Sequence, residues 1–583
     1  MNLSRRALIQ LLAGSASAVA LPRVSGQERA LPPAPAPIAA PPGFGVAPGP
    51  FQPTWESLSS YRVPDWYRDA KFGIWAHWGP QCQPEMGDWY AQRMYQEKNA
   101  AYRFHVEKYG HPSKFGFKDV IHEWKADKWE PEKLMALYKR AGAKFFAAMA
   151  NHHDNFDMFD SKYQPWNSVA IGPRKDIVGG WARAARSAGL KLAVSCHGDR
   201  AWSWYQDAQR ADTSGPMAGV PYDGTLGKAD GKGLWWEGLD PQDLYAQYHP
   251  IGKYNWQQTG EPPLDKAYIE KFFNRTIDLI DKYRPDLLYF DDTVLPIYPA
   301  SDIGLRIAAY FYNTSMARNR GRLEAVITGK GLNADQRRAL VFDVERGVTQ
   351  GGEVLPWQTD TCIGSWHYER RVFEQHRYKT AGQVVQMLID IVSKNGNLML
   401  SIPVRGDGTI DEDELKVVEG LAAWMGPNGE GIFATRPWKV YGEGPSVASP
   451  APRGQFGGAR DVRPYTSEDI RFTAKGDVLY AFAMSWPENG TLTIKSLARG
   501  SVEFPREIAR VELLGARGIG AGGEPARGEG RRLRTRVEDH TPVAPSPLSR
   551  PSRPTAMAPS GPAASPSCGS RIISASVETA ISG

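Results

Sequence analysis

Short apolar runs alternate with amphipathic helical patterns between about residue 51 and residue 435. Between the runs, Pro131–Ala141 and Lys266–Tyr283 carry apolar residues along one helical face. The runs themselves are predicted as buried strands: Phe72–Trp78, Lys144–Asn151, Lys191–His197, Asp286–Asp291, Ala325–Thr328, Leu340–Val344 and Asn397–Pro403. Buried strands that alternate with helices are typical of a parallel sheet covered by helices. For residues 51–435 we therefore predict an α/β fold, a (β/α)8-like, TIM-type barrel.

A different pattern begins at about residue 436. Val478–Trp486 places bulky residues at every second position, and Pro487–Gly490 then leads into Thr491–Ile494. This pattern predicts a β-hairpin, and we expect residues 436–515 to form an antiparallel β-sandwich. Residues 516–583 are rich in Gly, Arg, Pro and Ser, which predicts a disordered tail. The sandwich would then be incomplete, as a change of reading frame near the 3′ end would produce.

The N-terminus has the features of an export signal. Arg5 and Arg6 precede the apolar, small-residue run Leu8–Leu21, and we predict a signal peptide over residues 1–26. The paired arginines favour the twin-arginine route to the periplasm or the exterior, with the Sec route as the alternative. Residues 27–50 are rich in Pro and Ala and are predicted as an extended linker. No other apolar run reaches about 18 residues, so we expect no stable membrane insertion.

Composition excludes several other classes. With 42% hydrophobic and 23% charged residues, the 583-residue chain is neither wholly disordered nor fibrous. Its formal charge of +6 lies at the ends, +3 in residues 1–26 and +4 in residues 516–583, so the body is close to neutral and we expect no nucleic-acid partner. The four cysteines are far apart and form neither a disulfide scaffold nor a metal motif: Cys82, Cys196, Cys362 and Cys568.

Polar residues follow several of the predicted strands, where a parallel barrel gathers its catalytic groups. They are His77, His152, His153, His197, Asp291 and Glu345. Aromatic residues crowd the same segments, among them Trp75, Trp89, Trp204, Tyr289 and Trp366. Aromatic faces beside imidazoles and carboxylates suit a sugar, whose C–H faces stack and whose hydroxyls form hydrogen bonds. Glycoside cleavage requires two carboxyl groups, and Asp291 and Glu345 offer that pair.

The same segments contain an ordered set of motifs. They are Lys71–Gly79, Asp88–Tyr90, Ala141–Lys144, His152–Phe156, Trp166–Ser168, Tyr289–Asp291, Lys394–Leu398 and Asn428–Glu430. In this order the chain resembles the α-L-fucosidases of glycoside hydrolase family 29 over about residues 55 to 500. The resemblance implies a (β/α)8-like catalytic domain with a β-sandwich, no metal and no cofactor. It also implies an exo-acting enzyme that releases terminal α-L-fucosyl residues from fucosylated oligosaccharides or glycoconjugates with retention of configuration.

The resemblance also implies individual roles. Asp291 is expected to be the nucleophile, with Asp292 as a less favoured substitute, and Glu345 the acid/base, with Glu353 as the runner-up. The expected sugar contacts are His77, Asp88, Trp89, His152, His153, Tyr289 and, for the C6 methyl group, Trp75. His197 stands where many relatives have a different sequence, and we expect it to supply the polar contact that is otherwise missing.

Several alternatives remain open at this stage. The chain could act on a related L-sugar, or could be a carbohydrate-binding relative whose catalysis has lapsed. The adjacent His152 and His153 could instead belong to a metal-dependent barrel hydrolase, although no carboxylate–histidine spacing supports a metal. Glu345 could be held structurally by Arg346. The sequence gives no indication of oligomeric state.

Overall fold

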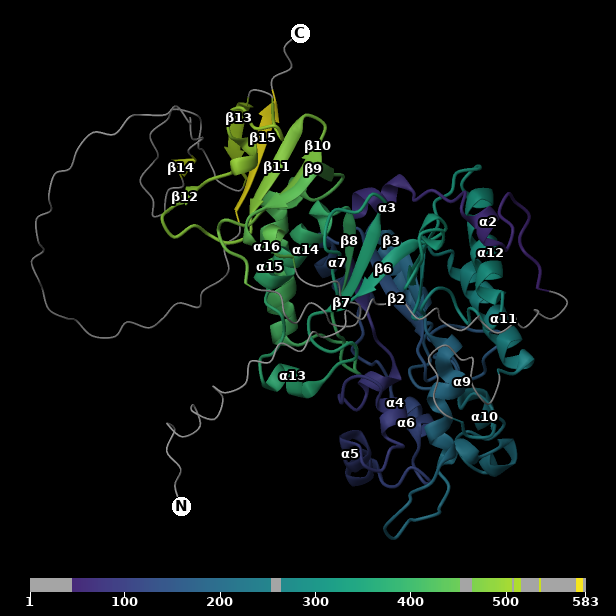
Figure 1. Ribbon diagram of the computed structural model, residues 1–583. Coiled ribbons are helices and arrows are strands. Elements are labelled where there is room, and N and C mark those ends of the chain that lie inside the picture. Colours follow the sequence, from purple (N-terminus) through teal and green to yellow (C-terminus); the bar gives the residue numbers. More distant parts are fainter. Residues whose placement is uncertain are drawn as a thin grey trace, which may run out of the picture.

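Eight parallel strands close into a barrel, and their order around the barrel is their order along the chain (Figure 1). The last strand pairs with the first, with Ser401 beside Trp75, so no strand edge is left open. The strands are β1 Phe72–Ala76, β2 Phe145–Asn151, β3 Lys191–Cys196, β4 Leu287–Phe290, β5 Val326–Lys330, β6 Val341–Glu345, β7 Trp357–Cys362 and β8 Gly396–Ser401. The prediction of a TIM-type barrel is confirmed.

The computed structural model describes residues 44–252, 264–450, 464–505, 508–514, 534–535 and 573–579. The predicted signal peptide and most of the predicted linker lie outside this part of the chain. The last residues of that linker do not form a free tether. The Phe44 ring lies 4.6 Å from that of Phe273, and Asn313 Nδ2 donates a hydrogen bond to the Ala47 carbonyl at 2.8 Å. These contacts attach residues 44–50 to the two long helices that carry Phe273 and Asn313.

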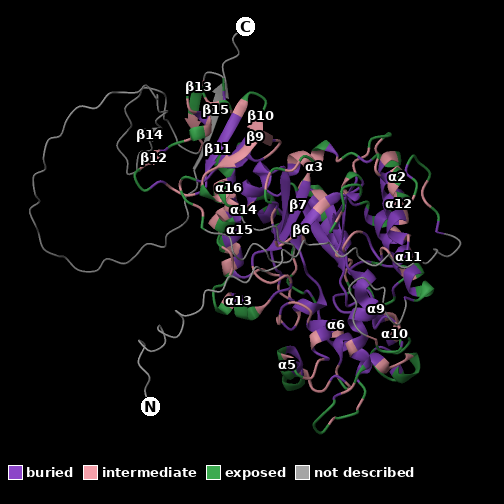
Figure 2. Cartoon of the chain, in the orientation of Figure 1, coloured by how far each residue is buried: buried purple, intermediate pink, exposed green. Residues whose placement is uncertain are grey.

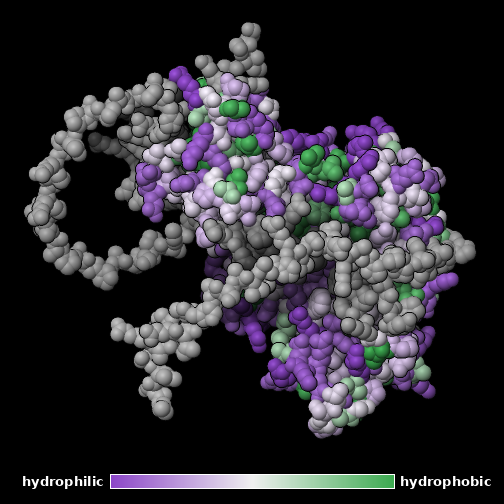
Figure 3. All heavy atoms as spheres, in the orientation of Figure 1, coloured by the Kyte–Doolittle hydropathy of each residue, from purple (hydrophilic) through white to green (hydrophobic). Residues whose placement is uncertain are grey.

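Helices cover the outer face of the barrel strands, and side chains inside the barrel bury the inner face, so both faces of most strands are buried (Figure 2). The α-helices are α2 Trp55–Leu58, α3 Asp65–Ala70, α4 Tyr90–Arg93, α5 Ala100–Tyr109, α6 Phe117–Glu123, α7 Pro131–Arg140, α8 Ile177–Ser187, α9 Ala201–Trp204, α10 Pro241–Leu244, α11 Lys266–Tyr283, α12 Ile303–Arg318, α13 Arg370–Glu374, α14 Ala381–Ser393, α15 Glu412–Asn428 and α16 Pro445–Ala448. Hydrophilic side chains predominate on the outer face seen in Figure 3. Among the described residues, no helix combines the length and the apolar character needed to cross a membrane.

Strand β7 is the barrel strand that the sequence analysis missed. Its inward positions are polar rather than apolar, because Gln358 and Asp360 project into the barrel and are fully buried there. Both side chains have partners inside the barrel: Gln358 Nε2 donates to Asp343 at 2.8 Å, and Asp360 accepts from the Tyr289 hydroxyl at 2.8 Å. A strand whose interior face is hydrogen-bonded in this way has no apolar run to recognise.

The C-terminal region is an antiparallel sheet that packs against α14 and α15. Its five strands lie in the order β13-β15-β11-β10-β9. Their bounds are β9 Arg436–Glu443, β10 Ile470–Lys475, β11 Val478–Ala483, β13 Ile508–Leu513 and β15 Ile573–Thr579, and a separate small sheet pairs β12 Thr491–Leu492 with β14 Arg534–Thr535. Phe482 lies 6.4 Å from the Trp424 ring, and Arg471 Nε reaches Asp390 Oδ1 of α14 at 2.7 Å.

Two predictions for this region require correction. The hairpin does not join Val478–Trp486 to Thr491–Ile494, because β11 pairs with the preceding strand β10 through a short turn, while β12 pairs with β14. The predicted disorder does not extend over residues 573–579, which form β15 between β11 and β13. Its Ser, Ala and Val residues alternate too weakly to stand out in a polar segment, and pairing on both edges defines the strand.

Candidate active site

The carboxyl ends of the barrel strands bring together the residues that the sequence analysis singled out. His77 follows β1, His152 and His153 follow β2, and His197 follows β3. Asp291 directly follows β4, whereas Glu345 is the last residue of β6. The last residue of β5, Lys330, completes this set although the sequence analysis did not predict it. Seven polar side chains therefore meet at one end of the barrel.

Asp291 is held at both carboxylate oxygens. Lys330 Nζ lies 2.7 Å from Oδ1. On the other side, His153 Nε2 and His197 Nδ1 lie 3.3 and 3.4 Å from Oδ2. Burial would raise the pKa of Asp291, but the Lys330 charge and the two imidazole contacts prevail and hold that pKa well below its usual value. Asp291 is therefore ionised at neutral pH, as a nucleophile must be.

Glu345 contacts the same lysine but differs in its protonation. Its Oε2 lies 2.6 Å from Lys330 Nζ. Burial raises the pKa of Glu345 to about 7, against the lowering effect of Lys330 and with further upward contributions from Asp360 and Asp291. Glu345 can thus keep a proton near neutral pH, where an ordinary glutamate is ionised. Two neighbouring carboxyl groups whose pKa values are displaced in opposite directions are typical of an acid and nucleophile pair.

The shared lysine also limits the separation of the two carboxyl groups. Because Asp291 Oδ1 and Glu345 Oε2 both contact Lys330 Nζ, they can be no farther apart than the 2.7 and 2.6 Å contacts laid end to end. Retaining glycosidases place their two carboxyl groups about 5–5.5 Å apart, whereas inverting enzymes need about 6.5–9.5 Å. This separation is closer to the spacing of retaining enzymes than to that of inverting ones.

The structure places the alternative carboxylates elsewhere. Glu353 pairs with Arg337 at 2.8 Å, and its backbone N–H donates to the Lys394 carbonyl. Both partners precede barrel strands, so Glu353 lies at the opposite end of the barrel from Asp291. Asp292 is almost fully buried in an ion pair with Arg200 and accepts a hydrogen bond from the Ile297 N–H at 3.0 Å. Neither carboxylate is placed to act on a sugar at Asp291.

An ion pair between Glu345 and Arg346 is one of the alternatives that the sequence leaves open. In the structure, Arg346 Nη2 contacts Cys362 Sγ at 3.1 Å and lies 3.9 Å from Asp88 Oδ2. Its guanidinium carbon stands 4.9 Å from the centre of the Trp366 ring. Arg346 thus reaches the segment after β1 and the end of β7, whereas Lys330 contacts Glu345 at 2.6 Å.

Four imidazole rings form a buried cluster beside Asp291. The His77 ring lies 5.1 Å from those of His152 and His197, and the His152 ring lies 4.3 Å from that of His153. Burial, with added repulsion from neighbouring imidazoles, lowers the pKa of His77 and His152 well below the usual value. Burial likewise lowers the pKa of His197 to about 4. These three rings are therefore neutral at pH 7, each with one donor and one acceptor nitrogen.

A hydrogen bond fixes which nitrogen of His152 carries the proton. Gln81 Nε2 donates to His152 Nδ1 at 2.8 Å and to Asp154 Oδ2 at 3.0 Å, while Gln81 Oε1 accepts from the Ala91 N–H at 3.3 Å. This orientation of the amide leaves Nδ1 as the acceptor and Nε2–H as the donor. A donor on Nε2 suits a sugar hydroxyl.

Two groups of three histidines are close enough to be considered as metal sites. They are His77 with His152 and His367, and His152 with His153 and His197, each with ligand atoms within 4.8 Å of one another. Both groups include His152, whose Nδ1 accepts from Gln81 and whose Nε2 then carries the proton. Neither nitrogen presents the free lone pair that a metal ion requires, so these residues do not fit a metal as they are arranged.

Aromatic rings form a wall beside the histidine cluster. The Trp75 ring lies 4.9 Å from Tyr289, 5.4 Å from Trp366 and 4.6 Å from His77. Several buried ring nitrogens here have no hydrogen-bond partner within the described residues, including Trp75 Nε1, His77 Nδ1 and His197 Nε2. Buried polar groups normally find partners. Unpartnered ring nitrogens, among them the Trp75 indole donor, therefore indicate a site for a hydroxyl-bearing ligand, because a hydroxyl both donates and accepts hydrogen bonds.

Asp88 and Trp89 lie on the segment before α4, on the rim of this cluster. Asp88 Oδ1 accepts a hydrogen bond from the His367 N–H at 2.8 Å and lies 3.6 Å from His367 Nδ1. The Trp89 ring lies 6.2 Å from that of His153. His367, which is fully buried and 4.5 Å from the His77 ring, is a residue that the sequence analysis did not predict.

Lys330 and His367 were not predicted for the same reason, namely that the apolar pattern did not show where their strands end. Lys330 ends a strand that the apolar pattern terminated at Thr328, and His367 follows β7, which the pattern did not reveal. A signal existed for Lys330, because an isolated lysine at the carboxyl end of a parallel strand is itself an unusual residue. No comparable signal marked His367.

Known proteins resemble the chain in sequence and in fold. The model of the family described as Alpha-L-fucosidase matches residues 43–430. Tissue alpha-L-fucosidase of Rattus norvegicus is 25% identical over 467 residues, which cover 78% of this chain and 83% of the rat protein. The human tissue alpha-L-fucosidase is 25% identical over 483 residues, 80% of this chain and 84% of the human protein.

Solved structures agree in fold. A Thermotoga maritima alpha-fucosidase in complex with fucose superposes with a TM-score of 0.54 at 23% identity, covering 75% of this chain and 87% of that protein. A Thermotoga maritima alpha-L-fucosynthase in complex with alpha-L-Fuc-(1-2)-beta-L-Fuc-N3 gives the same TM-score at 24% identity and the same coverage. The resemblance drawn from the motifs is thus confirmed by a match that spans all eight barrel strands, and the chain belongs to the alpha-L-fucosidase family of glycoside hydrolases.

Proposed function

We propose that the chain is a retaining exo-α-L-fucosidase in which Asp291 is the nucleophile and Glu345 the acid/base. The observation that carries the proposal is the contact of one lysine, Lys330, with both carboxyl groups. This contact sets a separation suited to double displacement, and it accompanies pKa values displaced in opposite directions. Family membership supports the fucoside as substrate.

In the first step, the Asp291 carboxylate attacks the anomeric carbon and forms a glycosyl ester. The glycosidic C–O bond breaks, and Glu345 transfers its proton to the departing oxygen. In the second step, Glu345 takes a proton from water, whose oxygen attacks the anomeric carbon and releases the Asp291 carboxylate. Configuration is inverted twice and hence retained.

The change in charge on Asp291 assists the switch in the role of Glu345. While Asp291 is ionised, its charge contributes to the raised pKa of Glu345. Once Asp291 is esterified that contribution vanishes, whereas Lys330 remains and still lowers the pKa of Glu345. Glu345 therefore holds a proton for the leaving group before the ester forms, and is more readily ionised, as a base must be, afterwards.

The remaining residues suit a neutral deoxy sugar. The imidazoles of His77, His152 and His197 are uncharged and offer hydrogen bonds to hydroxyl groups. Trp75 is 1% exposed and offers an apolar surface for the C6 methyl group. A sugar with a hydroxyl at C6 would leave that hydroxyl unsatisfied against the ring, which favours α-L-fucosides over α-L-galactosides.

One comparison of turnover tests the proposal. The wild type should hydrolyse an aryl α-L-fucoside faster than the matching α-L-galactoside, and chelator should leave the rate unchanged. Equal rates would favour a related L-sugar as substrate. Binding without release of the aryl group would instead indicate a carbohydrate-binding protein, and loss of activity with chelator would indicate a metal-dependent hydrolase.

We also infer that the chain is exported to the periplasm or the exterior. The inference is supported by the arginine pair Arg5-Arg6 followed by the apolar run Leu8–Leu21. Replacement of both arginines by lysine should block a twin-arginine route and leave the protein in the cytoplasmic fraction. Unchanged export of this variant would indicate the Sec route, and a wild type that stays in the cytoplasm would contradict export.

A further inference from the structure

A buried hydrogen-bonded chain runs from α11 to the backbone that carries His197. Arg275 forms two contacts with Asp157, Nη2 to Oδ1 at 2.6 Å and Nε to Oδ2 at 3.0 Å. Asp157 Oδ1 in turn accepts from Asn151 Nδ2 at 3.0 Å. Asn151 Oδ1 accepts from the backbone N–H groups of His197 and Gly198 at 3.0 and 2.9 Å. We refer to Arg275, Asp157 and Asn151 as the Asn151 relay.

Both imidazoles that face Asp291 depend on the backbone that this relay holds. His197 Nδ1 lies 3.4 Å from Asp291 Oδ2. The His197 carbonyl accepts from His153 Nδ1 at 2.8 Å, which leaves His153 Nε2 3.3 Å from the same oxygen. One short segment of backbone thus places two rings against one oxygen of the nucleophile.

The local strand geometry directs Asn151 toward this segment. The pairing of β2 with β3 shifts between Met149 and Asn151, so that Asn151 stands beside Cys196 at the end of the strand. Gly198 permits the close approach, because a Cβ atom there would lie 3.1 Å from Asn151 Oδ1. A side chain at residue 198 would therefore press on the relay.

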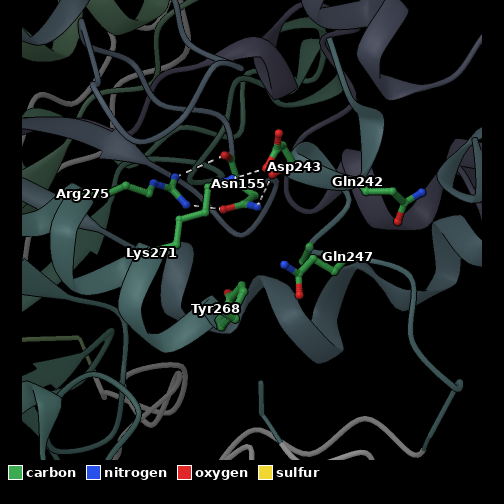
Figure 4. A pocket seen from close by; sticks show the side chains of 8 residues that line it. Asn155, Gln242, Asp243, Gln247, Tyr268, Lys271 and Arg275 are labelled. Atoms are coloured by element: carbon green, nitrogen blue, oxygen red, sulfur yellow. Dashed lines mark hydrogen bonds and ion pairs between the residues drawn. The ribbon is translucent and has the colours of Figure 1, made fainter. Parts of the chain in front are cut away.

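Arg275, at the far end of the relay, is also hydrogen-bonded to Asn155. Figure 4 shows Arg275 reaching from α11 to Asn155, with dashed lines marking the contacts. Arg275 Nη2 donates to the Asn155 carbonyl at 3.2 Å, and Asn155 Nδ2 donates to the carbonyls of Asp243 and Leu244 at 3.0 and 3.1 Å. Arg275, Asp157 and Asn151 are all at least 96% buried, so solvent does not compete for these hydrogen bonds.

We propose that Asn151, held by Asp157 and Arg275, is a positioning residue that fixes His197 and His153 on the nucleophile. This inference rests on the proposed function and deepens it. Asn151 does not touch the sugar or the reacting atoms. Its loss should therefore lower kcat, because Asp291 is misplaced and loses hydrogen bonds, and should change KM much less.

The test compares pH profiles of aryl fucoside hydrolysis. Asn151→Ala should lower kcat by about tenfold to hundredfold, with KM within about threefold. The acid limb should move to higher pH, because hydrogen bonds from His153 and His197 help to lower the pKa of Asp291. Lys330 and Glu345 also face Asp291 and are unchanged. If the acid limb instead reported protonation of His197, it should move to lower pH in Asn151→Ala. Asp291 raises the pKa of His197, and the variant weakens the contact between them.

A swapped pair and a matched control separate positioning from general damage. Asn151→Asp alone sets two carboxylates against each other, whereas Asn151→Asp combined with Asp157→Asn restores one acid and one amide and should recover at least part of kcat and the acid limb. Asp390→Asn removes an equally buried acid that pairs with Lys394 and Arg471. This control should lower the melting temperature and leave the acid limb in place.

A measurement that does not need turnover keeps the proposal separate from the proposed function. In protein labelled with ¹⁵N-histidine, Asn151→Ala should shift the ring signals that Asp291→Asn also shifts, and Gly198→Ala should do the same if Asn151→Ala fails to fold. Absence of fucoside turnover in the wild type would refute the proposed function and leave this test intact. Unshifted ring signals together with an unmoved acid limb, or a swapped pair without recovery, would overturn the positioning role.

Discussion

The two sides of the active site solve different problems. The histidine side comprises His77, His152, His153 and His197 at the ends of β1 to β3, and the carboxylate side comprises Asp291, Lys330 and Glu345 at the ends of β4 to β6. On the histidine side, burial keeps the rings of His77, His152 and His197 neutral. Hydrogen bonds to Gln81 and to a backbone carbonyl orient His152 and His153, respectively. On the carboxylate side, one buried cation contacts two acids.

The difference shows how the site divides its work. Charge is concentrated where bonds are made and broken, because a preorganised cation stabilises charge best in a buried site. Neutral donors and acceptors are concentrated where a sugar would be bound, because an uncharged ligand does not compensate for burying an ion. Disturbing the carboxylate side, or His153 and His197 that contact Asp291, should therefore affect kcat. Disturbing His77 or His152 should mainly affect binding.

The largest effect is expected at the nucleophile. Asp291→Ala should lower kcat by about 10⁴-fold or more, because the covalent intermediate cannot form. Azide should then restore turnover and give a glycosyl azide of inverted configuration, identified by NMR. An alanine variant that retains the wild-type rate would remove Asp291 from the mechanism.

The acid/base should give the next largest effect, and it should depend on the leaving group. Glu345→Gln should lower kcat/KM by about 10²–10⁴-fold for a natural glycan and far less for an activated aryl fucoside, which needs little proton donation. Azide should here yield a product of retained configuration, since it attacks the glycosyl ester on Asp291. The wild-type rate should fall above about pH 7, where Glu345 loses its proton, and this limb should vanish in the variant. A limb that survives would point to another acid.

Replacement of the shared cation should give an intermediate effect with a distinct pH signature. Lys330→Gln should lower kcat by about 10²-fold. Lys330 lowers the pKa of both Asp291 and Glu345, so its loss should move both limbs of the pH profile to higher pH. Lys330→Arg serves as the control and should keep the limbs near their original positions. If the two limbs of the pH profile move in opposite directions or stay fixed in Lys330→Gln, Lys330 does not lower the pKa of both carboxyl groups.

The smallest effect is expected on the histidine side. Gln81→Leu removes the donor that sets the tautomer of His152, and KM should rise by about tenfold with kcat little changed. Because Nδ1 of His152 is then free, the variant should also be inhibited by Zn²⁺ at lower concentration than the wild type. A fall in kcat at constant KM would show that the division between the two sides is wrong.

The sequence predicted the part of this protein that follows local patterns. Seven of the eight barrel strands were recognisable as apolar runs. The residues directly after these runs indicated which side chains lie at one end of the barrel. The eighth strand, Trp357–Cys362, was missed because its interior positions hold Gln358 and Asp360, which are stabilised by hydrogen bonds across the barrel rather than by apolar burial. With that strand His367 was missed as well.

The C-terminal sheet shows the same limit. A turn sequence suggested that Val478–Trp486 pairs with the segment after it, yet β11 pairs with β10 and with β15, which lies about ninety residues further along. Strand pairing depends on which edges meet in space, and a single hairpin signal does not contain that information.

The sequence by itself determined the barrel, the identity of the strand-end residues and the resemblance to a family, because each depends on local order along the chain. Only the tertiary structure put Glu345 beside Asp291 and Glu353 beside Arg337, placed Lys330 between the two carboxyl groups, and connected Asn151 to the backbone of His197. These features are distances between residues far apart in sequence. They arise when the barrel closes, and they set the pKa values on which the chemistry depends.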